Sequence, residues 1–168
     1  MKFLKNYGLK KDDQFVVLHL REPGFFDADQ HKNRNVKPEN YIGAVKYLLD
    51  QGFKVLRIGH KRMSPMLEKL GFIDLTQVEK PPEVDIFLSA NAKFAFGTHS
   101  GPASLSMTFG VPFVETSRVD YSGVRQNHFA QYLKYFQPAS GKVMKFKDII
   151  DLNCRGIFAA NVFEQKGL

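Results

Sequence analysis

The chain has 168 residues, of which 43% are hydrophobic and 13% aromatic, which is enough for one packed globular domain and excludes a disordered chain. Its single cysteine excludes an internal disulfide and a cysteine-cluster metal site, so a reducing, cytoplasmic setting is the default. The formal net charge of +7 favours phosphorylated ligands, polyanions or an anionic membrane surface. Because the basic residues are scattered rather than clustered, the pattern argues against nucleic acid as a partner.

No apolar run approaches the roughly 20 residues of a membrane-spanning helix, and the N-terminus lacks an apolar stretch of signal-peptide length. We therefore expect a soluble protein that is at most peripheral at the inner face of a membrane.

The first two thirds of the chain alternate between apolar strands and short amphipathic helices. The expected strands are 15–20, 53–58, 71–75, 94–96 and 111–114, and the expected helices lie within 1–9, 38–49, 64–70, 84–90 and 103–109. Strands that alternate with helices predict a parallel sheet with right-handed crossovers. The fold class expected is therefore α/β, an open doubly wound, Rossmann-like sheet.

The pattern is looser after residue 114, where we expect helices at 126–136, 146–152 and 156–165 and a short strand at 143–144. We predict one domain over 1–168, with its best-supported core at 13–117 and a C-terminal helical extension at 118–168. The polar stretch 23–37 has no periodicity, and a loop of this length is more often functional than a mere connection.

A turn of small and hydroxyl residues, 97–101, joins the strand at 94–96 to the helix that follows. The backbone N–H groups at that helix start, the helix dipole and the nearby hydroxyls of Thr98 and Ser100 suit an anion, best a phosphate. An ordinary strand-to-helix turn with a serine or threonine N-cap explains the same local pattern equally well.

Ligands of open parallel sheets bind beyond the carboxyl ends of the strands, and this rule gathers scattered residues into one site. Arg21 suits a bidentate contact with phosphate, and His60 and His99 are further donors. A surface salt bridge with Glu22 or Asp27 is the alternative for Arg21. The residues brought together are His19, Arg21, Glu22, Gly59, His60, Thr98, His99, Ser100, Gly101, Glu115, Thr116 and Ser117. A histidine inside an apolar strand is more often a satisfied core residue than a ligand, so we expect His19 to be structural.

Signatures of dinucleotide enzymes, P-loop nucleotidases, zinc proteases and serine hydrolases are absent. The candidate acids and bases are Glu22, Asp27, Asp29, His31 and Glu115, and their spacing pairs no two of them. Asp27, Asp29 and His31 alternate in a polar loop, which is more typical of solvated side chains than of a metal site.

The segment 96–105, FGTHSGPASL, followed by the FGVP of 109–112, resembles the sugar-nucleotide turn of GT-B glycosyltransferases, especially of heptosyltransferases. The strand ending HLRE at 19–22 is similar to the H-x-R opening of fucosyltransferase-like enzymes, and Arg34-Asn35 precedes the next helix. Together these motifs look closest to bacterial glycosyltransferases of surface-polysaccharide genes. The likeness spans roughly 15–116, and His99 and Ser100 depart from the usual pattern.

The resemblance implies metal-independent sugar transfer from a nucleoside-diphosphate sugar, which is the donor substrate, with no separate cofactor. Thr98, His99, Ser100, Gly101 and Ala103 would then hold the diphosphate. Arg21 and Glu22 would act in catalysis, and Gly59 and His60 would border the nucleoside. The acceptor would be a saccharide or a lipid-linked saccharide.

Length is the main departure from that family, because a GT-B enzyme has two such domains and this chain has material for one, which matches the C-terminal, donor-binding half. A second domain or chain would complete the cleft. The alternative is a non-catalytic module that binds a phosphorylated or anionic saccharide.

Overall fold

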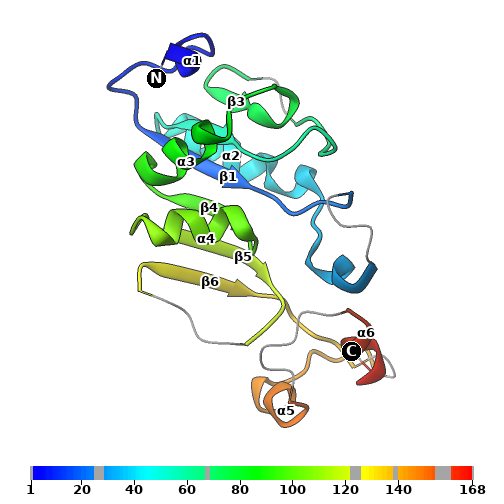
Figure 1. Cartoon of the computed structure of the whole chain (residues 1–168). Coiled ribbons are helices and arrows are strands. Elements are labelled where there is room, and N and C mark those ends of the chain that lie inside the picture. The colour runs from blue at the N-terminus through cyan, green and yellow to red at the C-terminus, as the bar shows by residue number, and fades with distance from the viewer. Residues whose placement is uncertain are drawn as a thin grey trace.

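The computed structural model describes residues 2–24, 29–66, 69–121, 126–137, 140–153 and 160–167. Within these ranges six strands form one sheet in the order β3-β2-β1-β4-β5-β6, and every neighbouring pair is parallel (Figure 1). The strands are β1 (Phe15–His19), β2 (Lys54–Arg57), β3 (Phe72–Asp74), β4 (Ala95–Thr98), β5 (Phe113–Arg118) and β6 (His128–Tyr132). The predicted open, doubly wound parallel sheet is confirmed.

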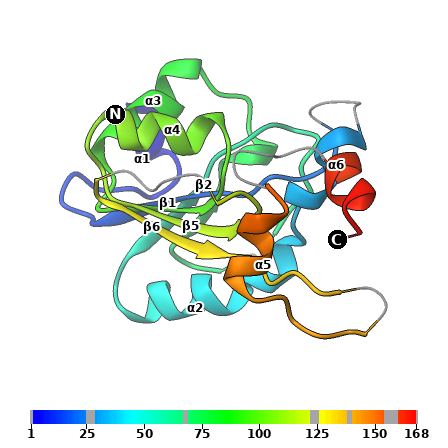
Figure 2. The same cartoon turned by 90° about the horizontal axis from the view of Figure 1, so that it is seen from below.

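Helices cover both faces of the sheet (Figures 1 and 2). On one face lie α1 (Lys2–Lys5), α3 (Pro82–Asn91) and α4 (Gly101–Thr108), and on the other lies α2 (Ile42–Asp50). Three short 3₁₀ helices, η1 (Asp29–Arg34), η2 (Pro38–Tyr41) and η3 (Leu75–Gln77), lie between these elements. The two C-terminal helices, α5 (Phe146–Asp151) and α6 (Ala160–Gln165), lie beyond the β6 side of the sheet.

Strand β1 is buried along its whole length because its side chains alternate between two cores. Phe15 and Val17 join the core under α1, α3 and α4, whereas Val16 and Leu18 join the core under α2. Val16, Val17 and Leu18 are each at most 1% exposed, and burial of such a side chain contributes about 1.5–3 kcal/mol. A near-continuous apolar run is the expected sequence of a parallel strand covered on both faces.

The carboxyl ends of β1 and β4 approach each other closely at Gly97. Its φ of +134° lies in the region that favours glycine, and a Cβ there would overlap the main-chain carbonyl oxygen of His19. The turn that follows β4 is therefore held against the end of β1.

Two predicted helices are wrong. The described residues of 64–70 form no helix, because the side chains of Arg57, Glu22 and Asp74 bond the polar backbone groups of Ser64 and Met66. Residues 128–132 of the predicted helix 126–136 form β6, which pairs with β5. Phe136 forms an isolated antiparallel bridge with Val143.

The polar stretch 23–37 contains η1 among its described residues, whereas Asp27 lies outside them. Helix α6 lies against η1, with Lys32 Nζ 2.9 Å from Glu164 Oε1. No described helix is both long enough and apolar enough to cross a membrane.

Candidate functional site

A cavity of about 450 Å³ opens at the carboxyl ends of β1, β2 and β4. Strand β1 has β2 on one side and β4 on the other, so the order of strands reverses here, and open α/β sheets bind ligands at this point. The cavity is lined by His19, Arg21, Glu22, Gly59, His60, Met63, Asp85, Ser100, Gly101 and Pro102. It thus brings together Arg21, Glu22, Gly59, His60, Ser100 and Gly101 of the predicted site residues.

The hydroxyl groups of the turn between β4 and α4 form hydrogen bonds to other groups of the protein. Thr98 Oγ1 accepts a hydrogen bond from the backbone N–H of Arg21 at 2.6 Å. Ser100 Oγ lies 2.8 Å from His19 Nδ1, and Ser100 is the N-cap residue of α4 without a capping bond from its side chain. The side chain of Ala103 is buried in the core beneath α4. The backbone N–H groups of the first turn of α4 are therefore the groups best placed for an anion.

His19 is neutral at ordinary pH. Its pKa is lowered to about 3, first by burial and then by the positive charges of Arg57, His60 and Arg21. Its contact with Ser100 Oγ couples the end of β1 to the start of α4.

Two arginines lie near each other beside this turn. Burial lowers the pKa of Arg21, and the pKa of Arg34 is lowered by burial and then by the charge of Arg21. Arg34 Nη2 donates to the carbonyl oxygen of His99 at 2.9 Å. Arg34 belongs to the resemblance at 34–35 but has no role predicted from sequence, because it precedes η2 and its approach to the end of β4 is a tertiary contact.

His99 turns toward β5 and does not line the cavity. Its Nδ1 lies 3.0 Å from Oε1 of Glu115, a fully buried carboxylate. His128 Nε2 and Arg118 Nη1 contact the other oxygen of Glu115 at 2.7 and 3.1 Å. This cluster ties β4, β5 and β6 together, and burial lowers the pKa of His128 while Glu115 raises it.

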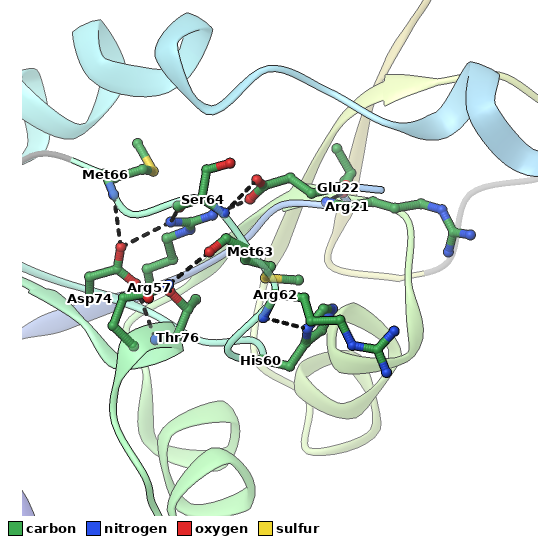
Figure 3. A network of polar contacts seen from close by, with 12 residues as sticks. Arg21, Glu22, Arg57, His60, Arg62, Met63, Ser64, Met66, Asp74 and Thr76 are labelled. Atoms are coloured by element: carbon green, nitrogen blue, oxygen red, sulfur yellow. Dashed lines mark hydrogen bonds and ion pairs between the residues drawn. The ribbon is translucent and has the colours of Figure 1, made fainter. Parts of the chain in front are cut away.

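Arg57 is fully buried and forms the centre of a polar network between β1, β2 and β3 (Figure 3). Its Nη2 pairs with Glu22 Oε1, and its Nη1 lies 2.9 Å from Asp74 Oδ2 and 2.6 Å from the carbonyl oxygen of Ser64. Glu22 Oε2 accepts from the backbone N–H of Ser64 at 2.9 Å, so both of its oxygens are engaged. Met66 N–H donates to Asp74 Oδ2 at 3.1 Å.

The network fixes the segment 59–66, which carries Gly59, His60 and Met63 to the cavity. The φ of Gly59 is +154°, and a Cβ there would overlap the Met63 sulfur. His60 Nδ1 accepts from the Arg62 N–H at 3.2 Å, and burial together with the charge of Arg62 lowers the pKa of His60.

Asp85 of α3 is a lining residue that sequence reasoning missed. Asp85 lies on a helix that was expected only to pack on the sheet, so nothing in the sequence indicated that it lines the cavity. Across the described residues, no group of three or more histidine, cysteine, aspartate or glutamate side chains is arranged to hold a metal ion.

No protein-family profile matches the chain, and no curated protein matches it. Among solved structures, E. coli ADP-heptose LPS heptosyltransferase II matches at 13% identity with a TM-score of 0.51, covering 98% of this chain and 51% of that one. The fold is that of about half of this heptosyltransferase. Because the identity is low, the likeness confirms the resemblance to GT-B glycosyltransferases as a resemblance of fold.

Two further solved structures give TM-scores of 0.48. The glycosyl transferase family 9 protein from Veillonella parvula DSM 2008 is 13% identical and covers 79% of this chain and 38% of that one. KpsC from Thermosulfurimonas dismutans, a β Kdo 2,4 transferase, is 12% identical and covers 85% and 52%. The chain thus spans about half the length, or less, of each of these three structures.

Proposed function

We propose that this chain is the donor-binding part of a metal-independent glycosyltransferase and holds the diphosphate of a nucleoside-diphosphate sugar at the start of α4. The observation that carries the proposal is the cavity between β1, β2 and α4, which places Arg21 and Gly101 at the reversal point of the sheet.

The start of α4 provides main-chain donors and the positive end of a helix dipole, and Arg21 provides a full positive charge. The charge of Arg21 lowers the pKa of Arg34, so the two arginines are close enough to add their positive charges at this edge of the sheet. As the glycosidic bond breaks, the same groups would stabilise the negative charge that develops on the departing diphosphate.

Glu22 was a candidate catalytic residue, but Arg57 and the Ser64 N–H engage both of its oxygens. We assign it a positioning role, since it holds the segment 59–66 against the cavity. Gly59 and His60 of that segment would border the nucleoside.

The main test compares two valine substitutions. A Cβ on Gly101 would meet no atom within 4 Å, and the same is true of Gly43 in the first turn of α2. Gly101→Val should fold and yet prevent a phosphate from approaching the backbone, whereas Gly43→Val should keep full affinity. Calorimetry with a panel of nucleoside diphosphates measures both.

Arg21→Ala should weaken the binding of nucleoside diphosphates at least about tenfold and that of the matching monophosphates less, because charge-assisted hydrogen bonds are lost. Unchanged diphosphate affinity in both Arg21→Ala and Gly101→Val, with an intact circular dichroism spectrum, would refute the proposal. So would the absence of binding at millimolar ligand.

The second candidate is a non-catalytic module that binds a phosphorylated or anionic saccharide in the same cavity. It is favoured by the engagement of both carboxylate oxygens of Glu22, which leaves that residue no free oxygen for catalysis. A transfer assay with nucleotide sugars and saccharide or lipid-linked acceptors separates the two. Turnover by this chain rejects the module, and binding without turnover favours it or a second chain that completes the cleft.

A further inference from the structure

Large apolar side chains are exposed on the segment that leaves the carboxyl end of β6 and leads into α5. Phe136 and Val143 oppose each other in the isolated antiparallel bridge, and Phe146 begins α5. These three side chains are 51%, 53% and 61% exposed. Figure 1 shows α5 beyond the β6 side of the sheet. Exposed apolar side chains that gather on one short segment are typical of a surface that binds a partner.

The exposed side chains are held outward by their neighbours, which pack inward. Tyr135 and Met144 flank the bridge and pack against the small buried cluster of Ile149 and Phe163. The ring of Tyr135 stacks on that of Phe163 with centroids 5.3 Å apart. Because the inward positions on both arms of the bridge are filled by this cluster, Phe136 and its partner in the bridge stay on the solvent side.

Exposed lysines flank these apolar side chains in the sequence. They are Lys134, Lys142, Lys145 and Lys147. Lys147 pairs with Asp151 within α5. Lys145 is the N-cap residue of α5, where a positive charge opposes the helix dipole, so the stability of this helix does not explain a lysine there. We call Lys134, Phe136, Lys142, Val143, Lys145 and Phe146 the basic apolar surface.

The combination of charge and apolar area selects one kind of partner. A second copy of the chain, related by a two-fold axis, would bring its own lysines against this surface, and like charges disfavour that contact. A polyanion without apolar groups would leave Phe136 and Val143 in water. A bilayer with anionic lipids offers negative charge at its surface and an apolar layer beneath it, so it matches both features.

We propose that the basic apolar surface docks the chain reversibly on a bilayer that contains anionic lipids. The apolar side chains would enter the boundary between headgroups and acyl chains, while the lysines meet the lipid phosphates. Strand β6 is parallel to β5, and the sheet is parallel throughout, so this surface lies at the edge of the sheet where the cavity opens. Docking would therefore bring the mouth of the cavity close to the bilayer. This inference is independent of the proposed diphosphate site.

The experiment is co-sedimentation of the full chain with vesicles of phosphatidylcholine alone and of phosphatidylcholine and phosphatidylglycerol in equal parts. The chain should sediment only with the vesicles that contain phosphatidylglycerol, and added salt should weaken this binding. Lys134→Gln with Lys145→Gln should weaken it by about twentyfold and remove most of its salt dependence, since each lysine contributes about fivefold. Phe136→Ser with Val143→Ser should weaken it by about tenfold and leave the salt dependence in place.

The matched control lies at the opposite edge of the sheet, directly before β3. Leu70 is 94% exposed and follows Lys69, which is also exposed, so Lys69→Gln with Leu70→Ser removes one exposed lysine and one exposed apolar side chain. This variant should keep the affinity of the wild type for both kinds of vesicle. Circular dichroism checks that every variant keeps its fold.

Three results would overturn the inference. The wild type could sediment with neither kind of vesicle, or equally with both. The control variant could lose as much binding as the variants of the basic apolar surface. Finally, ultracentrifugation could show a dimer that Phe136→Ser with Val143→Ser abolishes, in a chain that binds no vesicle, which would make this surface a contact between copies. None of these results bears on the affinity for nucleoside diphosphates, which calorimetry measures without vesicles.

Discussion

Glu22→Gln should destabilise the protein because it removes one partner of a buried ion pair. Glu22 is 6% exposed and Arg57 is fully buried, so neither charge is compensated by water. Removing one member of such a pair costs about 3–5 kcal/mol, since the other charge stays buried. Asp74 still pairs with Arg57 at 2.9 Å, which places the expected loss near the lower end, at about 3 kcal/mol.

Glutamine also fails to replace the hydrogen bonds of Glu22. One carboxylate oxygen faces Arg57 and the other faces the N–H of Ser64, so the amide NH₂ of glutamine would meet a donor at one of the two positions. The substitution should therefore also loosen the segment 59–66, which lines the cavity.

Urea unfolding followed by circular dichroism measures the loss in the free energy of unfolding. In thermal unfolding, the melting temperature should fall by roughly 6–12 °C for a chain of this length. Glu39→Gln is the control, because Glu39 is exposed in η2 and should change the free energy of unfolding by at most about 0.5 kcal/mol. If Glu22→Gln is no more destabilising than Glu39→Gln, the ion pair does not support the segment 59–66 and the positioning role fails.

Three further predictions concern the junction of β1, β4 and α4. His19 has a folded-state pKa of about 3 and an unfolded-state pKa near 6.5, so between these pH values the unfolded chain binds one more proton than the folded chain. The free energy of unfolding should therefore fall as the pH drops through this window, by up to about 1.4 kcal/mol per pH unit. His19→Asn should flatten that slope in unfolding titrations. Ser100→Ala should reduce the free energy of unfolding by about 1–3 kcal/mol in urea titrations, because it removes the hydrogen-bond partner of the buried His19 Nδ1. A change in ligand affinity without a change in stability would contradict this. Gly97→Ala should unfold the chain or lower its melting temperature sharply, since the new Cβ overlaps the His19 carbonyl oxygen; a wild-type melting curve would contradict the close approach.

The sheet was predictable from sequence because its central strands are short apolar runs bounded by polar turns. The edge strand β6 was not. In 126–136 the apolar residues Phe129, Leu133 and Phe136 recur at helical spacing, yet in the structure these three are exposed. Pairing with β5 overrides that local periodicity, as tertiary context often does for strands.

The part of the candidate site that directly follows the carboxyl ends of the parallel strands was predictable from the sequence. Arg21, His60 and Gly101 follow from that rule. The pairing of Glu22 with Arg57 joins residues 35 positions apart and has no signature in spacing. For the same reason nothing in the sequence signals that His99 faces Glu115 rather than the cavity.

The central place of β1 has a consequence for how the chain folds. Strands β1, β2 and β3 are consecutive in sequence, and β2 pairs with both β1 and β3, whereas β4 must return from far along the chain to pair with the opposite edge of β1. Because closing that long loop costs entropy before its contacts form, we expect the N-terminal unit of three parallel strands to assemble first and β4 to dock afterwards. Ligand affinity should thus appear only in the last phase of refolding, and a ribosome-bound chain that stops short of α4 would have a sheet but no binding site.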